Sequence, residues 1–109
     1  MADKSVVKTV QRYQQMLVAS GIPVSNVILF GSHVGNYNHR WSDIDVLVVS
    51  PRFDGKRKRE DINLLWRIAA RVDSRIEPVA VGQCQFEEDD SSAIIEIARR
   101  EGEVIAPPL

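Results

Sequence analysis

The chain has 109 residues and a formal net charge of −1 at pH 7. This length predicts one small domain over residues 1–109, with room for one core and a site on one face. The near-neutral charge excludes a general attraction to nucleic acid or to an anionic membrane surface. Apolar residues make up 44% of the sequence and charged residues 27%, as is usual for a soluble globular protein.

The sequence contains one cysteine, Cys84, which excludes a disulfide within the chain and suits the reducing cytosol. Cys84 is expected to serve in packing or at the surface. The N-terminal segment MADKSVVKTV is charged and lacks the long apolar stretch of a signal peptide. No apolar run is long enough to span a bilayer. We therefore expect a cytoplasmic protein without membrane contact.

Apolar residues at helical spacing predict helices over residues 4–19, 57–72 and 91–101. Ser91 or Asp90 is expected to cap the third helix. The side chains expected to face inward are Val6, Val10, Tyr13 and Leu17 with Met16 in the first helix, Ile62, Leu65, Ala69 and Val72 with Trp66 beside them in the second, and Ile94, Ile95 and Ala98 in the third.

Three apolar runs predict strands over residues 26–30, 44–50 and 75–81. The second run, IDVLVVS, is apolar on both faces, as expected of a central strand that is covered on both sides. Pro78 lies inside the third run, so this strand is either an edge strand or carries a bulge. The C-terminal EVIAPPL adds a short strand. Together these elements predict an α/β or α+β domain with a small sheet.

Charge is locally uneven, because residues 52–60 (RFDGKRKRE) are basic and residues 87–90 (EEDD) are acidic. Solvated loop and helix surface is the first interpretation of both segments. The alternative for the basic run is a contact with phosphate or nucleic acid.

Two carboxylates, Asp43 and Asp45, lie at the start of the predicted central strand. Alternate residues of a strand point to the same face, so these side chains repel each other in an apolar setting. A divalent cation would relieve that repulsion, and oxygen ligands suit Mg²⁺ or Mn²⁺. A turn or cap role is the alternative, but Asp45 lies inside the apolar strand, where an unpaired charge is costly.

Glu77 interrupts the third strand in the same way. It would complete a three-carboxylate cluster, able to hold two metal ions, if that strand lies beside the second. The alternative for Glu77 is a solvent-facing residue paired with Arg75. Gly31 and Ser32 follow the first strand, where glycine lets a phosphate approach the backbone and free N–H groups favour anions. A simple turn is the alternative for this pair.

Taken together, these features resemble the nucleotidyltransferase superfamily, the DNA polymerase β-like group. The features are Gly31-Ser32 after an apolar strand, ten intervening residues, Asp43-x-Asp45 leading an apolar strand, and a later strand carboxylate. The small size is most similar to the minimal nucleotidyltransferases of bacteria and archaea, over residues 25–82. Many family members carry a glycine where this chain has Asn36, and here Gly35 comes one residue earlier.

The resemblance implies a mixed sheet flanked by helices and a role for each matching residue. Gly31 and Ser32, with His33 or Arg40 as a further phosphate contact, would bind the β- and γ-phosphates of a nucleoside triphosphate. Asp43 and Asp45 would hold the metal ions, and Glu77 would lie near the metal that activates the acceptor hydroxyl.

The first functional hypothesis is an enzyme that uses Mg²⁺ or Mn²⁺ to transfer a nucleoside monophosphate, with AMP from ATP favoured, to a hydroxyl. Minimal nucleotidyltransferases often act as antitoxins beside a helical HEPN protein, so we expect a HEPN-type toxin or a second copy of this chain to complete acceptor recognition. The alternatives are a module that neutralises a partner by contact and a nucleotide- or metal-sensing domain without transfer. A nucleic-acid polymerase that binds duplex DNA is not expected, because the sequence shows no thumb or fingers segment to hold a duplex.

Overall fold

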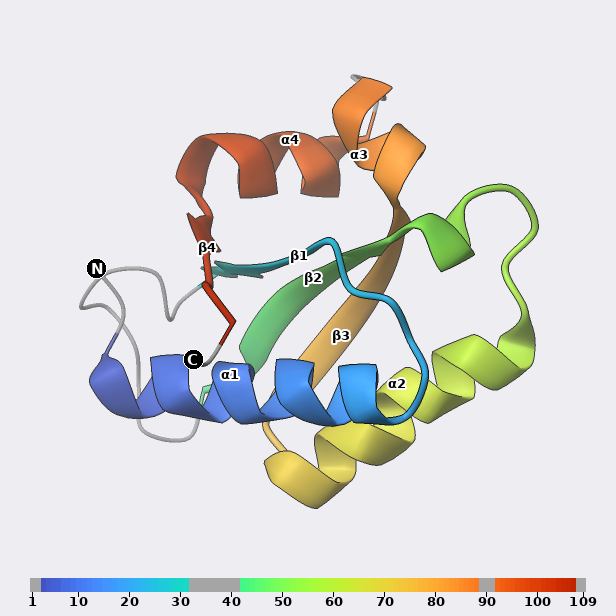
Figure 1. Cartoon of the computed structure of the whole chain (residues 1–109). Helices are drawn as coiled ribbons and strands as arrows, with labels where there is room; N and C mark the ends of the chain where they lie inside the picture. Colours follow the sequence, from blue (N-terminus) through green and yellow to red (C-terminus); the bar gives the residue numbers. More distant parts are fainter. Residues whose placement is uncertain (1–2, 32–41, 89–91, 108–109) are drawn as a thin grey trace.

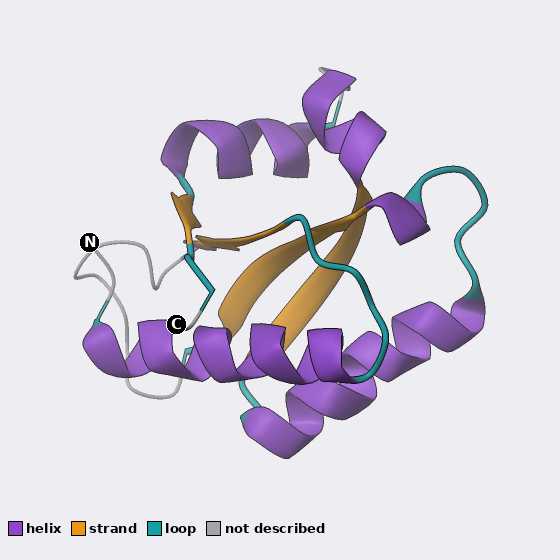
Figure 2. Ribbon diagram, viewed as in Figure 1, coloured by secondary structure: helices purple, strands orange, loops and turns teal. Residues whose placement is uncertain are grey.

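The computed structural model describes residues 3–31, 42–88 and 92–107. The elements in chain order are α1 (Lys4–Ala19), β1 (Asn26–Phe30), β2 (Ile44–Ser50), the 3-10 turn η2 (Pro51–Phe53), α2 (Arg59–Val72), β3 (Ile76–Gly82), α3 (Gln83–Glu88), α4 (Ala93–Glu101) and β4 (Glu103–Val104). Helices α1 and α2 cover one face of the sheet, and α3 and α4 lie on the other (Figures 1 and 2). The predicted class, a small mixed sheet flanked by helices, is confirmed.

The sheet has the strand order β3-β2-β1-β4. Strand β2 pairs antiparallel with β1 and parallel with β3, and β4 pairs antiparallel with β1. The predicted central position of β2 is therefore confirmed. Pro78 lies in the edge strand β3, as its missing N–H requires.

Strand β2 is buried on both faces because two separate apolar clusters use it. Ile44, Val46 and Val48 pack with α1 and α2, whereas Leu47 and Val49 pack with α4. Alternation along the strand therefore places Asp45 on the α3/α4 face, where it is only half-buried.

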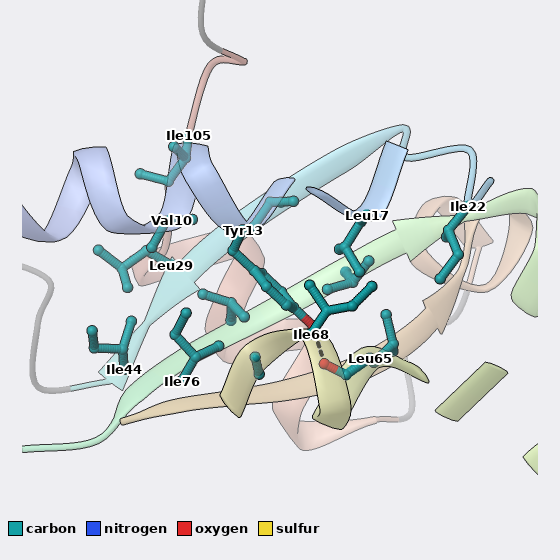
Figure 3. Packing of buried hydrophobic residues seen from close by; sticks show 14 of the residues in the cluster. Val10, Tyr13, Leu17, Ile22, Leu29, Ile44, Leu65, Ile68, Ile76 and Ile105 are labelled. Carbon is teal, nitrogen blue, oxygen red and sulfur yellow. Dashed lines mark hydrogen bonds between the residues drawn. The ribbon is translucent and has the colours of Figure 1, made fainter. Parts of the chain in front are cut away.

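The larger cluster lies between the sheet and the helices α1 and α2, and Figure 3 shows its central side chains. All four inward positions predicted for α1 are buried, and Met16 packs against the same cluster. Tyr13 crosses from α1 to α2, where its hydroxyl donates a hydrogen bond of 2.9 Å to the carbonyl oxygen of Leu65. This bond fixes the two helices relative to each other.

The prediction that Trp66 belongs to the core is wrong, because 47% of this residue is exposed. The buried face of α2 is formed by Leu65, Ile68 and Ala69, with Asp61 one turn earlier. Trp66 follows Leu65 and so lies about 100° further around the helix, outside that stripe. A large aromatic side chain is a weaker signal of burial than its position on the helix.

The third predicted helix also differs in detail. It begins at Ala93, and Ser92 is its N-cap, since the Ser92 hydroxyl accepts a hydrogen bond from the backbone N–H of Ile95. The caps predicted from residues 90 and 91 lie outside the described residues. Ile95 is buried as expected, but Ile94 is 44% exposed, because α4 presents only one narrow stripe to the sheet.

Helix α3 was not predicted from the sequence, because QCQFEE is too short to show helical periodicity. The Asp54 carboxylate accepts a hydrogen bond from the backbone N–H of Cys84 at the start of this helix. This long-range contact, which sequence patterns do not reveal, stabilises the helix. Cys84 itself is exposed. In the described residues, no helix combines the length and apolar character needed to cross a membrane.

Replacing Tyr13 with Phe should lower the free energy of unfolding by about 1 kcal/mol, because a buried hydrogen bond is lost while the ring remains. Urea denaturation measures the change. Thr9→Ala is a suitable control, because the Thr9 hydroxyl donates a bond of similar length, 2.9 Å, on an exposed helix surface. A loss no greater for Tyr13→Phe than for Thr9→Ala would contradict the importance of the Tyr13 contact.

Candidate active site

Three carboxylates meet at the end of the sheet where β2 and β3 begin. In the parallel register of these strands, Asp45 lies opposite Glu77. Asp43 precedes β2 directly and is exposed. The sequence analysis predicted a cluster of three carboxylates if the third strand lies beside the second. The pairing of β3 with β2 confirms that arrangement.

The clustering has an electrostatic consequence at Glu77. Partial desolvation, followed by the negative charges of Asp43 and Asp45, raises the pKa of Glu77 above its usual range. Arg75 forms an ion pair with Asp73 at 2.8 Å. The charges that act on Glu77 are those of Asp43 and Asp45. The cluster therefore favours the binding of either a proton or a cation.

Gly31 brings the end of β1 against this cluster. Phe30, the last residue of β1, pairs with Asp45 across the antiparallel ladder. Gly31 follows with a φ of +80°, a conformation that other residues rarely adopt. A Cβ atom at this position would lie 2.5 Å from the Oδ2 atom of Asp45. A larger residue would therefore need both the strained positive φ and a shift of the Asp45 carboxylate away from its position.

Phe30 is a neighbour of the site that the sequence analysis missed. Directly opposed residues of an antiparallel pair point to the same face, so this half-buried ring lies on the side of Asp45. The register between β1 and β2 sets this position, so no local sequence pattern could have placed Phe30 opposite Asp45. The other predicted nucleotide contacts, Ser32, His33 and Arg40, lie outside the described residues.

The arrangement suits a metal that is shared with a substrate. Among residues 3–31, 42–88 and 92–107, no group of three or more His, Cys, Asp or Glu side chains is placed to hold a metal ion by itself. Mg²⁺ is usually bound by one or two carboxylates together with substrate phosphates, so such a complete protein cage is not required. Asp43 and Asp45 fit that kind of site, and their charges raise the pKa of the neighbouring Glu77.

The comparisons with known proteins agree with this architecture. A family model for the nucleotidyltransferase domain matches residues 7–101, and the chain therefore belongs to this family of transferases. This result confirms the resemblance noted in the sequence. No match was found among curated protein sequences.

Solved structures share the fold. A toxin–antitoxin complex crystallised with AMP-PNP is similar with a TM-score of 0.60 at 21% identity, covering 90% of this chain and 73% of that one. A candidate nucleotidyltransferase from Sulfolobus solfataricus gives 0.62 at 14% identity, with coverages of 92% and 78%. An aspartate-to-glutamate double mutant of the toxin–antitoxin pair MntA–HpeT gives 0.59 at 19% identity, with coverages of 90% and 73%. At these identities the likeness establishes the fold alone.

Gly31→Ala should destabilise the protein and weaken nucleotide binding, because it combines backbone strain of about 1 kcal/mol or more with a collision at Asp45. Gly55→Ala is a matched control, since Gly55 also has a positive φ of +72° but has nothing within 4 Å of its would-be Cβ. Urea denaturation and nucleotide titration measure both effects. Equal behaviour of the two variants would contradict the close approach of Gly31 to Asp45.

Glu77→Gln should raise the free energy of unfolding at pH 7. The raised pKa means that the folded state binds the Glu77 proton more tightly than the unfolded state, so the charged side chain lowers stability as pH rises above its ordinary pKa of 4.5. The advantage of the variant should vanish as pH falls below that value. Denaturation at several pH values measures it, with Glu96→Gln on the exposed face of α4 as the control for losing one charge. A Glu77→Gln profile parallel to that of the natural protein would be the contrary result.

Proposed function

We propose that the chain is a single nucleotidyltransferase domain that transfers a nucleoside monophosphate, AMP from ATP in the favoured case, to a hydroxyl group. The observation that carries the proposal is the meeting of Asp43, Asp45 and Glu77 at one end of the sheet, with the backbone of Gly31 against Asp45. The family to which the chain belongs supports the same reaction class.

In this reaction the acceptor oxygen attacks the α-phosphorus, and the bond between that phosphorus and the bridging oxygen of pyrophosphate breaks. Glu77, the third carboxylate of the cluster and the neighbour of Asp45 across the β2/β3 pairing, would take the hydroxyl proton. Asp43 and Asp45 would hold Mg²⁺ or Mn²⁺, which neutralises charge on the attacking and leaving oxygens. Gly31, Ser32 and His33 would bind the β- and γ-phosphates.

A partner protein is proposed to complete the site. Two of the similar structures are toxin–antitoxin complexes, and one of them was crystallised with AMP-PNP. These likenesses support an antitoxin that uses a nucleoside triphosphate. We propose further that it is cytoplasmic and acts on a HEPN-type toxin. A second copy of this chain is the alternative partner.

A contact-only antitoxin is the second candidate. Ile94, Ile97 and Val104 are large apolar residues near the C-terminal end of the described chain, and each is at least 39% exposed. Exposed apolar side chains of this kind favour protein contact. In that case the fold would neutralise the partner without transfer.

Asp45→Asn distinguishes these functions. For the enzyme, we expect calorimetric binding of Mg–ATP to weaken and AMP transfer to a co-expressed HEPN protein to fall at least about 100-fold, because charge stabilisation by the metal is lost. Glu96→Gln, which neutralises an exposed carboxylate on α4, is the control. An Asp45→Asn variant that still neutralises the toxin would support the contact-only function instead. Mg–ATP binding with no transfer to any acceptor would support a sensing domain.

A further inference from the structure

The positive charges of this chain are concentrated on one layer of the fold. Lys4, Lys8 and Arg12 lie on α1, residues 56–59 are all Lys or Arg, and Arg67 and Arg71 follow along α2. Every one of these side chains is exposed. We call the outward face of α1 and α2, together with residues 56–58, the α1/α2 surface.

Helix geometry places these cations on the same side of the molecule. Residues 4, 8 and 12 are spaced four apart, so they form one row on α1. This row lies opposite Tyr13 and Leu17, which face the sheet. On α2, Arg59 lies opposite the buried Ile68, and Arg67 lies about 100° around the helix from it. Because both helices pack against the same face of the sheet (Figure 1), their outward faces lie on one side of the molecule.

The α1/α2 surface has little negative charge of its own. Asp61 is buried at 5% exposure and is occupied by Arg52, which also donates to the carbonyl oxygen of Gly21. Exposed acids on these segments are Asp3 and Glu60. Within the described ranges, none of the surface cations forms an ion pair. The guanidinium of Arg57 donates a hydrogen bond to the side-chain oxygen of Gln85 in α3. The other charges of the α1/α2 surface are available to a ligand.

The opposite layer has the reverse charge. The exposed or half-buried acids of α3, α4 and β4 are Glu87, Glu88, Glu96, Glu101 and Glu103. They are accompanied by two cations, Arg99 and Arg100, and Arg99 is engaged with the carbonyl oxygen and ring of Phe86. The net charge of −1 thus conceals two layers of opposite sign. Such a separation attracts a polyanion to one face and orients it there.

Trp66 adds a stacking group to the positive layer. Trp66 is 47% exposed and lies about 100° around α2 from Arg67, outside the buried stripe of the helix. Basic side chains that neutralise phosphates, together with an exposed aromatic ring that stacks on an unpaired base, are the two components of single-strand binding. Arginine suits this use because its planar guanidinium matches the geometry of a phosphate.

We propose that the α1/α2 surface binds single-stranded nucleic acid, with the Lys and Arg side chains on the phosphates and Trp66 against a base. The lysines of this surface favour this ligand over a protein partner, because lysine is depleted at the cores of protein interfaces. They are Lys4, Lys8, Lys56 and Lys58. The charge pattern also favours nucleic acid over a second copy of the chain. The acidic layer of such a copy carries Arg99 and Arg100, which would repel the cations of the α1/α2 surface. This binding goes beyond the proposed transferase function and does not depend on it.

Fluorescence anisotropy with a labelled oligouridylate tests the proposal. The logarithm of the affinity should fall linearly with the logarithm of the salt concentration, with a slope of about −0.7 for each phosphate neutralised.

Arg67→Glu should weaken binding by about tenfold. Trp66→Ala should weaken it by about tenfold through lost stacking. Arg100→Glu, the same charge change on α4, is the matched control and should change affinity less than about twofold. Asp45→Asn should bind as the natural protein does, whatever the result for transfer.

Several results would overturn the proposal. One is the absence of binding at low salt, and another is an equal loss for Arg67→Glu and Arg100→Glu, which would reflect net charge alone. Displacement of the oligonucleotide by polyglutamate at equal charge concentration would indicate an acidic protein partner. Self-association in sedimentation that Arg67→Glu abolishes, without oligonucleotide binding, would assign the surface to a second copy.

Discussion

Repulsion among the carboxylates at the start of β2 and β3 is the constraint on which the rest of the structure depends. The parallel register sets Asp45 beside Glu77, and the antiparallel register with β1 brings Gly31 against Asp45. The repulsion contributes to the raised pKa of Glu77. The carboxylates lie at the start of β2, a strand that is otherwise buried on both faces.

The burial of β2 explains how such a small domain can hold neighbouring carboxylates in place. Its two faces are used by two apolar clusters, so the strand is fixed by the α1/α2 layer on one side and by α4 on the other. The contact of Tyr13 with Leu65 holds the first layer together. The carboxylates are therefore held on a rigid element, as metal and phosphate chemistry requires.

The sequence was sufficient for features that local patterns control. The period of α1, the two-faced apolar run of β2, and the edge position implied by Pro78 all predicted the structure correctly. The sequence was insufficient for features that depend on contacts between residues far apart in the chain. The cap that Asp54 supplies to α3, the pairing of Phe30 with Asp45 and the exposure of Trp66 depend on tertiary packing. Net charge was misleading for a similar reason, because it sums two layers that the fold separates.

The central claim is that a metal–triphosphate complex relieves the repulsion among Asp43, Asp45 and Glu77. The most direct test is an NMR titration of the Glu77 side-chain carboxyl carbon with and without Mg²⁺ and AMP-PNP. If the account is correct, the pKa of Glu77 is raised in the free protein and falls when metal and nucleotide are added together. A pKa of Glu77 that stays unchanged in the presence of both, at concentrations that saturate binding, would contradict it.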